Sequence, residues 1–280
     1  DSEELAVDAT RGLRDYSDDV AAVVRALDIS SAHFVGWSMG GGVVQQLMLD
    51  HNELVASALL QAPVSPYGFG ATGGADGRLL SSEAAGCGAG GANPDFVARL
   101  AAGDTSADEQ TSPRNVYRGS YVKPGFESDL EDIWVESMLT TKTGDGAYPG
   151  TSVESENWPG FAPGTSGILN TMAPIYCNTS VIVELERKPQ LTWIHGVDDL
   201  IVSDTSFFDL NYLGQLGIIP GWPGEDVAPA QPMIAQTRAV FEAYAAAGGT
   251  YREIVVEDCG HSPHLEHPDA FDEALNAHLG

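Results

Sequence analysis

One serine near the start of the chain has neighbours that suit it for chemistry. Ser38 lies in the stretch GWSMG, between Gly36 and Gly40, and directly follows a short apolar run. A serine hydroxyl is a weak nucleophile, and it needs a base within hydrogen-bond reach and a third group that orients the base. Glycines two residues away on each side permit a tight strand-to-helix bend where larger side chains would collide. We therefore predict a nucleophilic role for Ser38; the alternative is a small residue at an ordinary turn.

An acid and a base follow two further apolar runs. Asp198 and Asp199 come after residues 190–197, and His261 comes after residues 250–256. In open parallel sheets, reactive groups gather at the carboxyl ends of the strands. The three polar positions therefore predict a serine, histidine and aspartate acting together in acyl transfer.

Two neighbours of the serine have predicted roles as well. Met39 begins the next expected helix, and its backbone N–H is positioned to stabilise a negative oxygen in the transition state. Trp37 fits a pocket wall and an ordinary core position equally well.

These residues require an alternation of strands and helices around them. Helical spacing is seen for Val20, Val23, Val24 and Leu27. The runs after them alternate between short apolar strands and longer helical patterns. This rhythm is typical of a parallel sheet flanked by helices. The expected helices are 15–29, 39–54, 233–249 and 268–279, and the expected strands lie within 32–37, 55–63, 190–202 and 250–261.

The alternation of strand and helix patterns stops between residues 64 and 188. Residues 68–93 are rich in Gly, Ala and Ser and are expected to be loop-like or poorly ordered. Helical patterns follow at 94–103 and 127–141. We predict a lid inserted into one α/β core, which divides the chain into core residues 1–63, lid residues 64–188 and core residues 189–280. Candidate apolar substrate contacts in this lid are Trp134, Met138 and Phe161.

Three motifs together resemble the α/β-hydrolase family. They are GWSMG (36–40), HGVDDLIV (195–202) and GHSPHLEHPDAF (260–271), and their order of serine, aspartate and histidine is that of the family. The resemblance covers about residues 12–63 and 190–280. It implies a mostly parallel sheet flanked by helices, an inserted lid, and hydrolysis through an acyl-serine intermediate.

The family's usual spacing, Gly-x-x-Asp before a short apolar run, selects Asp199 after Gly196 as the acid. Asp198 remains the rival, and Asp204 is a more distant alternative.

The Gly-His pattern selects His261 as the base. His264 and His267 are expected to shape the loop or to face solvent, and His195 is expected to be structural.

The resemblance implies a carboxylesterase or lactonase that acts on a small-molecule ester without cofactor or metal. Carbon–carbon bond hydrolases and cofactor-free perhydrolases use the same three groups, and a non-catalytic binding module on the same scaffold is an alternative of another class. Oligomeric state stays open.

About four strands and a helix normally precede the nucleophile strand in this family, and one of their loops donates the second oxyanion N–H. Only 37 residues precede Ser38 here. We therefore expect the natural chain to be longer, and strand 33–37 to have few or no strands on one side. The alternative is that the loop after Pro63 supplies the second donor.

The amino-acid composition limits the classes of binding partner that we expect. Forty acidic against thirteen basic residues give a formal net charge of −27, which disfavours binding to nucleic acid or to anionic membranes. No apolar stretch is long enough to span a membrane and no signal peptide is visible, so a cytoplasmic location is expected. Three cysteines do not suggest a disulfide framework, although a single pair is left open, and no metal-binding spacing occurs.

The acidic excess fits either adaptation to high salt or simple solubility. If it is a salt adaptation, the melting temperature should rise from low to molar KCl, because counter-ions screen repulsion among the carboxylates. Screening is largely complete at about 1 M, where the Debye length is about 3 Å. A melting temperature that stays flat across this range, measured by differential scanning fluorimetry, would leave only solubility.

Overall fold

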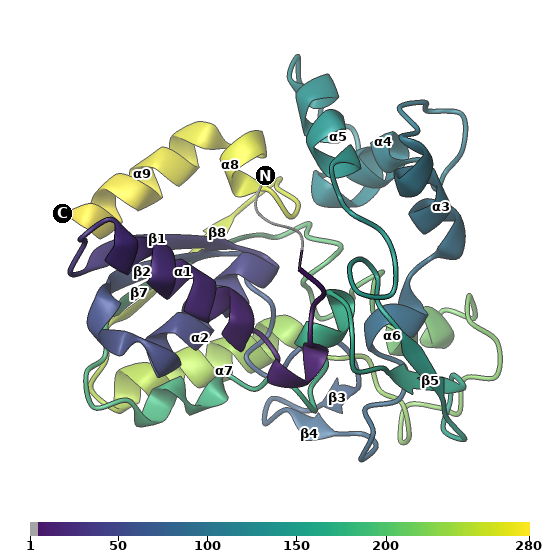
Figure 1. Cartoon of the computed structure of the whole chain (residues 1–280), viewed down its shortest axis with the longest axis horizontal. Coiled ribbons are helices and arrows are strands. Elements are labelled where there is room, and N and C mark those ends of the chain that lie inside the picture. The colour runs from purple at the N-terminus through teal and green to yellow at the C-terminus, as the bar shows by residue number, and fades with distance from the viewer. Residues whose placement is uncertain (1–4) are drawn as a thin grey trace.

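A four-stranded parallel sheet forms the centre of the molecule (Figure 1), as the computed structural model of the chain describes for residues 5–280. The strands lie in the order β1 (Ala32–Trp37), β2 (Val55–Gln61), β7 (Gln190–Gly196) and β8 (Tyr251–Val256). Every neighbouring pair is parallel. The predicted parallel α/β sheet is confirmed, with each strand inside its expected stretch.

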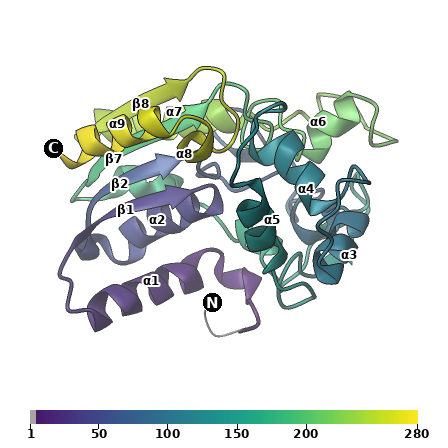
Figure 2. The same ribbon diagram turned by 90° about the horizontal axis from the view of Figure 1, so that it is seen from above.

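Helices cover both faces of this sheet (Figures 1 and 2). The helices α2 (Met39–Asp50) and α7 (Met233–Ala246) pack on one face, and α1 (Arg14–Ala26) packs against α2. On the other face lies α9 (Pro268–Leu279), which follows the short helix α8 (Pro263–Glu266). No helix within residues 5–280 is long and apolar enough to cross a membrane.

Neighbouring residues of β2 supply both halves of the core. Because side chains alternate along a strand, Leu59 and Leu60 point to opposite faces. Leu59 packs with Ile194 under α9, whereas Leu60 packs with Trp193 and with Phe241 of α7. All five side chains are at most 1% exposed, which explains why the sequence shows continuous apolar runs rather than alternation.

The long segment between β2 and β7, residues 64–188, is called the insertion below. Its helices α3 (Pro94–Ala102), α4 (Pro113–Val116) and α5 (Glu131–Leu139) pack together and lie beyond one end of the strands (Figure 2). The insertion adds no strand to the central sheet, but two short antiparallel hairpins that were not predicted form there. Their strands are β3 (Thr72–Gly73), β4 (Arg78–Leu79), β5 (Ser152–Glu154) and β6 (Phe161–Pro163).

Residues 68–93 were expected to be loop-like or poorly ordered. Outside the β3–β4 hairpin and a 3₁₀ helix at Gly88–Gly91 the backbone is irregular, but several of its side chains are buried. Ala71, Ala84 and Cys87 are at most 4% exposed and pack with Ala173 in a cluster of their own. Small side chains let these backbone segments approach closely, so the composition that suggested a loose loop instead supports dense packing. Cys87, like the other two cysteines, is a buried free thiol.

Several short helical elements had not been predicted. Among them are α4, α8, α6 (Leu210–Gln215) in the excursion after β7, and a π-helix at Tyr117–Tyr121 inside the insertion. They contain too few turns for an apolar period to be visible in sequence.

Strand β1 is the outer strand of the sheet that residues 5–280 form, paired with β2 on one side. On this strand Val35 is 49% exposed and Trp37 is 36% exposed. The strand that leads to Ser38 therefore lies at an edge of the described sheet.

Candidate active site

Ser38 occupies the bend between β1 and α2. Its backbone has φ 55° and ψ −123°, a conformation that residues with a side chain adopt only when their surroundings hold them there. Two hydrogen bonds hold this one: the Ser38 N–H donates to the Gln61 carbonyl over 2.9 Å, and the Val64 N–H donates to the Ser38 carbonyl over 3.0 Å. The end of the neighbouring strand β2 thus fixes the bend from one side.

The glycines two residues before and after Ser38 are not equally crowded, although the symmetric motif suggested that both prevent a collision. A Cβ on Gly36 would lie 2.5 Å from the Gly40 carbonyl oxygen, and one on Gly41 would lie 2.6 Å from the Cβ of Pro63. Gly42 is similarly crowded, whereas a Cβ on Gly40 would meet nothing within 4 Å. The prediction that Gly40 prevents a collision was wrong, since the close packing lies at Gly36, Gly41 and Gly42.

Asp199 and His261 are brought together at the ends of β7 and β8. Nδ1 of His261 lies 2.8 Å from Oδ2 of Asp199, and the two side chains are 0% and 1% exposed. The other carboxylate oxygen accepts the N–H groups of Ile201 at 2.7 Å and Val202 at 3.0 Å. A carboxylate held in this way keeps the proton on Nδ1 and leaves the lone pair on Nε2 to accept another.

Nε2 of His261 is buried and has no hydrogen-bond partner among residues 5–280. The Ser38 hydroxyl is not hydrogen-bonded to it in this structure, so the third link of the predicted triad is not closed. Bonds of this kind are often long before substrate binds. Trp37 does connect the two elements: its Nε1–H donates to the His261 carbonyl over 2.9 Å, and the two rings are 5.6 Å apart.

The other two acid candidates are engaged elsewhere. Asp198 is 41% exposed at its side chain and pairs with Lys123 at 2.7 Å. Asp204 accepts the N–H of Ile234 at 2.7 Å at the start of α7. Geometry therefore favours Asp199 as the partner of His261.

His264 lies near the site but is bonded away from it. Its Nδ1 is 2.7 Å from Nε2 of Gln61, and its ring centre is 4.9 Å from that of Trp37. Burial, with a smaller contribution from His261, lowers the pKa of His264. This histidine is suited to shaping the loop as a neutral ring.

The two remaining candidates contact neither Ser38 nor Asp199. His195 stacks on Trp193 with ring centres 4.2 Å apart and pairs with Glu253 at 2.9 Å. Nε2 of His267 bonds to the Asp258 carbonyl at 2.9 Å. Both contacts are structural.

Met39 is the first residue of α2, so its N–H has no acceptor within the helix and is available to a negatively charged oxygen. The loop after Pro63 was the alternative source of a second donor. Pro63 has no N–H, and that of Val64 already donates to the Ser38 carbonyl. The first two residues of that loop therefore cannot supply the second donor.

Tyr121, a residue that the sequence did not single out, forms a wall of the site. Its ring centre lies 6.1 Å from that of His261 and 6.2 Å from that of Trp37. With Phe69 it packs against the buried residues Ile201, Val202 and Met233. Because 83 positions separate Tyr121 from Ser38 and no motif surrounds it, only the fold reveals this proximity.

The expected lid contact Phe161 lies elsewhere. It packs inside the insertion, where a Cβ on Gly90 would come within 2.3 Å of its ring. Its position supports packing rather than substrate contact.

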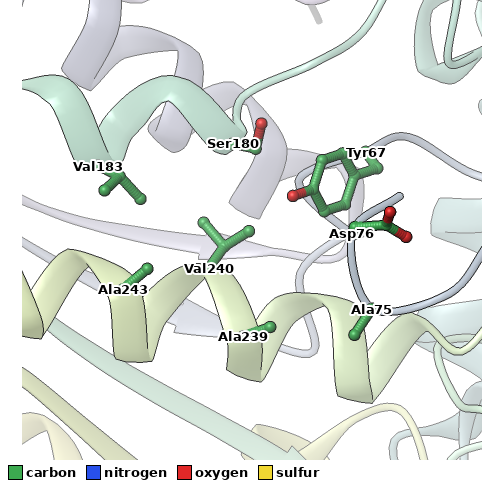
Figure 3. A pocket seen from close by; sticks show the side chains of 8 residues that line it. All are labelled: Tyr67, Ala75, Asp76, Ser180, Val183, Ala239, Val240 and Ala243. Atoms are coloured by element: carbon green, nitrogen blue, oxygen red, sulfur yellow. The ribbon is translucent and has the colours of Figure 1, made fainter. Parts of the chain in front are cut away.

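A separate hollow of about 400 Å³ opens on the α7 side of the molecule (Figure 3). Side chains of α7 face the 3₁₀ helix at Ser180–Glu184 across it, and Tyr67 lies at one end. It contains none of the predicted catalytic residues. Its lining is Tyr67, Ala75, Asp76, Ser180, Val183, Ala239, Val240 and Ala243.

No group of three metal-ligating side chains suited to holding an ion occurs in the part of the chain that the structure describes.

A parallel sheet with a serine bend, an acid and a histidine at its carboxyl edge defines the class as an α/β-fold hydrolase. The model of the alpha/beta hydrolase family matches residues 2–274. The chain therefore belongs to this family and is a hydrolase.

Solved structures show the same fold at low sequence identity. A probable hydrolytic enzyme from Pseudomonas aeruginosa matches with a TM-score of 0.53 and 15% identity, over 100% of this chain and 72% of that one. An esterase from Exiguobacterium antarcticum matches with a TM-score of 0.51 and 12% identity, over 99% and 76%. A bromoperoxidase from Bacillus anthracis has the same score and identity, over 99% and 77%. No curated protein matches the chain.

Proposed function

We propose that this hydrolase cleaves carboxylic esters or lactones of small molecules through an acyl-serine intermediate on Ser38. The observation that carries the proposal is the buried Asp199–His261 pair, with its second ring nitrogen unpaired, beside a serine held at φ 55°. An acid, a base with a free lone pair and a nucleophilic hydroxyl are the groups that acyl transfer needs.

In the first half of the reaction, Nε2 of His261 takes the hydroxyl proton as Oγ of Ser38 bonds to the ester carbonyl carbon. The carbonyl oxygen becomes negative and accepts the N–H of Met39. When this intermediate collapses, the carbon–oxygen bond to the alcohol breaks and the imidazolium returns the proton to the alcohol. The product is an ester on Ser38.

In the second half, a water molecule replaces the alcohol. His261 removes a proton from the water as its oxygen attacks the acyl carbon, and then protonates Oγ of Ser38 as the acid leaves. Asp199 remains charged throughout and stabilises the imidazolium in both halves.

We further propose that the insertion acts as a lid that forms part of the substrate pocket. Phe69 and Tyr121 belong to the insertion, and both pack against Ile201 and Met233 next to the acid. An apolar wall beside the nucleophile suits an apolar acyl group.

The test is labelling with a fluorophosphonate, followed by a panel of p-nitrophenyl esters from acetate to laurate and a set of lactones. We expect one equivalent of label on Ser38, found by peptide mass spectrometry, and turnover of at least one ester or lactone. A chain that neither accepts the label nor hydrolyses any substrate would support the binding-module alternative. Labelling of Ser38 without ester or lactone turnover would favour carbon–carbon bond hydrolysis.

A further inference from the structure

The carboxylate of Glu266, in the last turn of α8, binds the backbone on both sides of His261. Its Oε2 accepts the Gly260 N–H at 2.9 Å, and its Oε1 accepts the Ser262 N–H at 3.1 Å. Oε2 also accepts the N–H of Lys123, from the insertion, at 2.7 Å. One side chain thus collects three backbone donors from two segments that are 137 or more positions apart.

The same two segments touch at two further places. The Ser262 hydroxyl donates to the Tyr121 carbonyl at 2.5 Å. A Cβ on Gly260 would lie 2.6 Å from the Lys123 nitrogen, so only glycine fits between them. Residues 121–123 therefore lie directly against the backbone that carries His261.

Other bonds hold carbonyl groups of this backbone, such as that of His261, which accepts the Trp37 indole N–H. The N–H groups of Gly260 and Ser262, on either side of His261, are bound by Glu266. Asp258 has φ 55°, and α8 is a single turn of four residues. Hydrogen bonds from N–H groups to a carboxylate are shorter and stronger than those between neutral groups. Without the carboxylate, three partly buried N–H groups lose their acceptor. The free-energy cost is larger than that of losing one exposed hydrogen bond.

We propose that Glu266 is a positioning residue for His261, an inference that rests on the proposed function. By fixing Gly260 and Ser262 it keeps the imidazole in contact with Asp199 while Nε2 stays free. By binding Lys123 it also holds this backbone against the insertion. Glu266 does not touch the reacting atoms.

The test compares Glu266→Ala and Glu266→Gln with Glu273→Gln, which removes the same charge from an exposed position of α9. For the best p-nitrophenyl ester we expect Glu266→Ala to lower kcat by about 10²-fold, as misplacement of a catalytic group by about 1 Å does. Glu266→Gln retains one acceptor oxygen, so its kcat should lie between those of Glu266→Ala and the wild type. KM should stay within about twofold of wild type, and Glu273→Gln should be unaffected.

A second measurement separates positioning from a general loosening of the fold. In a His261→Ala background, adding Glu266→Gln should leave the residual activity unchanged, because the residue acts only through that histidine. Wild-type kcat in a folded Glu266→Ala variant would overturn the inference. So would a change confined to KM, or an equal loss in the His261→Ala background. Failure of the proposed function would show differently, as undiminished activity of Ser38→Ala.

Discussion

Replacement of Ser38 by alanine should lower kcat for ester hydrolysis by about 10⁶-fold, the size of effect seen when the nucleophile of a serine hydrolase is removed. Without Oγ no acyl-enzyme can form, and the remaining groups only polarise the carbonyl for direct attack by water. Initial rates on a p-nitrophenyl ester, measured with enough protein to quantify the residual rate, would show this. The variant should also lose the fluorophosphonate label.

Ser31→Ala is a matched control, since Ser31 lies exposed just before β1, at the other end of the strand from Ser38. It should leave both turnover and labelling at wild-type values. A folded Ser38→Ala variant with unchanged turnover would end the acyl-serine proposal.

Replacement of Asp199 by asparagine should lower kcat by about 10⁴-fold without unfolding the protein. Asparagine keeps the oxygen that accepts the N–H groups of Ile201 and Val202, so the turn is preserved. Its amide, however, donates a proton toward Nδ1 of His261, which favours the tautomer with the proton on Nε2. That tautomer cannot take the serine proton, and the loss of the same interaction in serine proteases has an effect of this size.

The neighbouring substitution Asp198→Asn is the control for Asp199→Asn. It removes an ion pair with Lys123 at a partly exposed position, and such pairs contribute little to stability. Turnover should stay within a few-fold of wild type, with both variants assayed side by side. A large loss of turnover in Asp198→Asn together with a small loss in Asp199→Asn would show that Asp198 is the acid. The hydrolase class would still stand.

The sheet and its flanking helices could be predicted because their signals are local. The apolar runs that became β1, β2, β7 and β8 are each bounded by turns or by polar residues, and α9 begins at a proline. The three polar positions of the site followed from the same reasoning, since each lies in the turn that follows the carboxyl end of a strand. Of these, the pairing of Asp199 with His261 is visible in the structure, whereas their catalytic roles remain predictions.

The features that were missed depend on contacts between distant parts of the chain. Gly40 and Gly41 look alike in sequence, but only Gly41 lies against Pro63. The Gly- and Ala-rich residues 68–93 have the composition of a loose loop. They are packed because Ala173, about 90 positions further on, completes their buried cluster. No local pattern could show that Tyr121 lies beside His261, because their proximity depends on how the insertion returns to the sheet.

The bond between Trp37 and the His261 carbonyl has a consequence for how this sequence can change during evolution. Position 37 is a free position in the Gly-x-Ser-x-Gly pattern, where the motif places no demand on the side chain. Here the indole N–H donates to a carbonyl that follows β8, and the ring contacts Tyr121 and His264 as well. A smaller residue at position 37 would leave a gap among three aromatic rings and an unsatisfied carbonyl next to the base. Substitution at this apparently variable position is therefore tied to compensating changes at positions 121 and 264, and the three should vary together among close homologues.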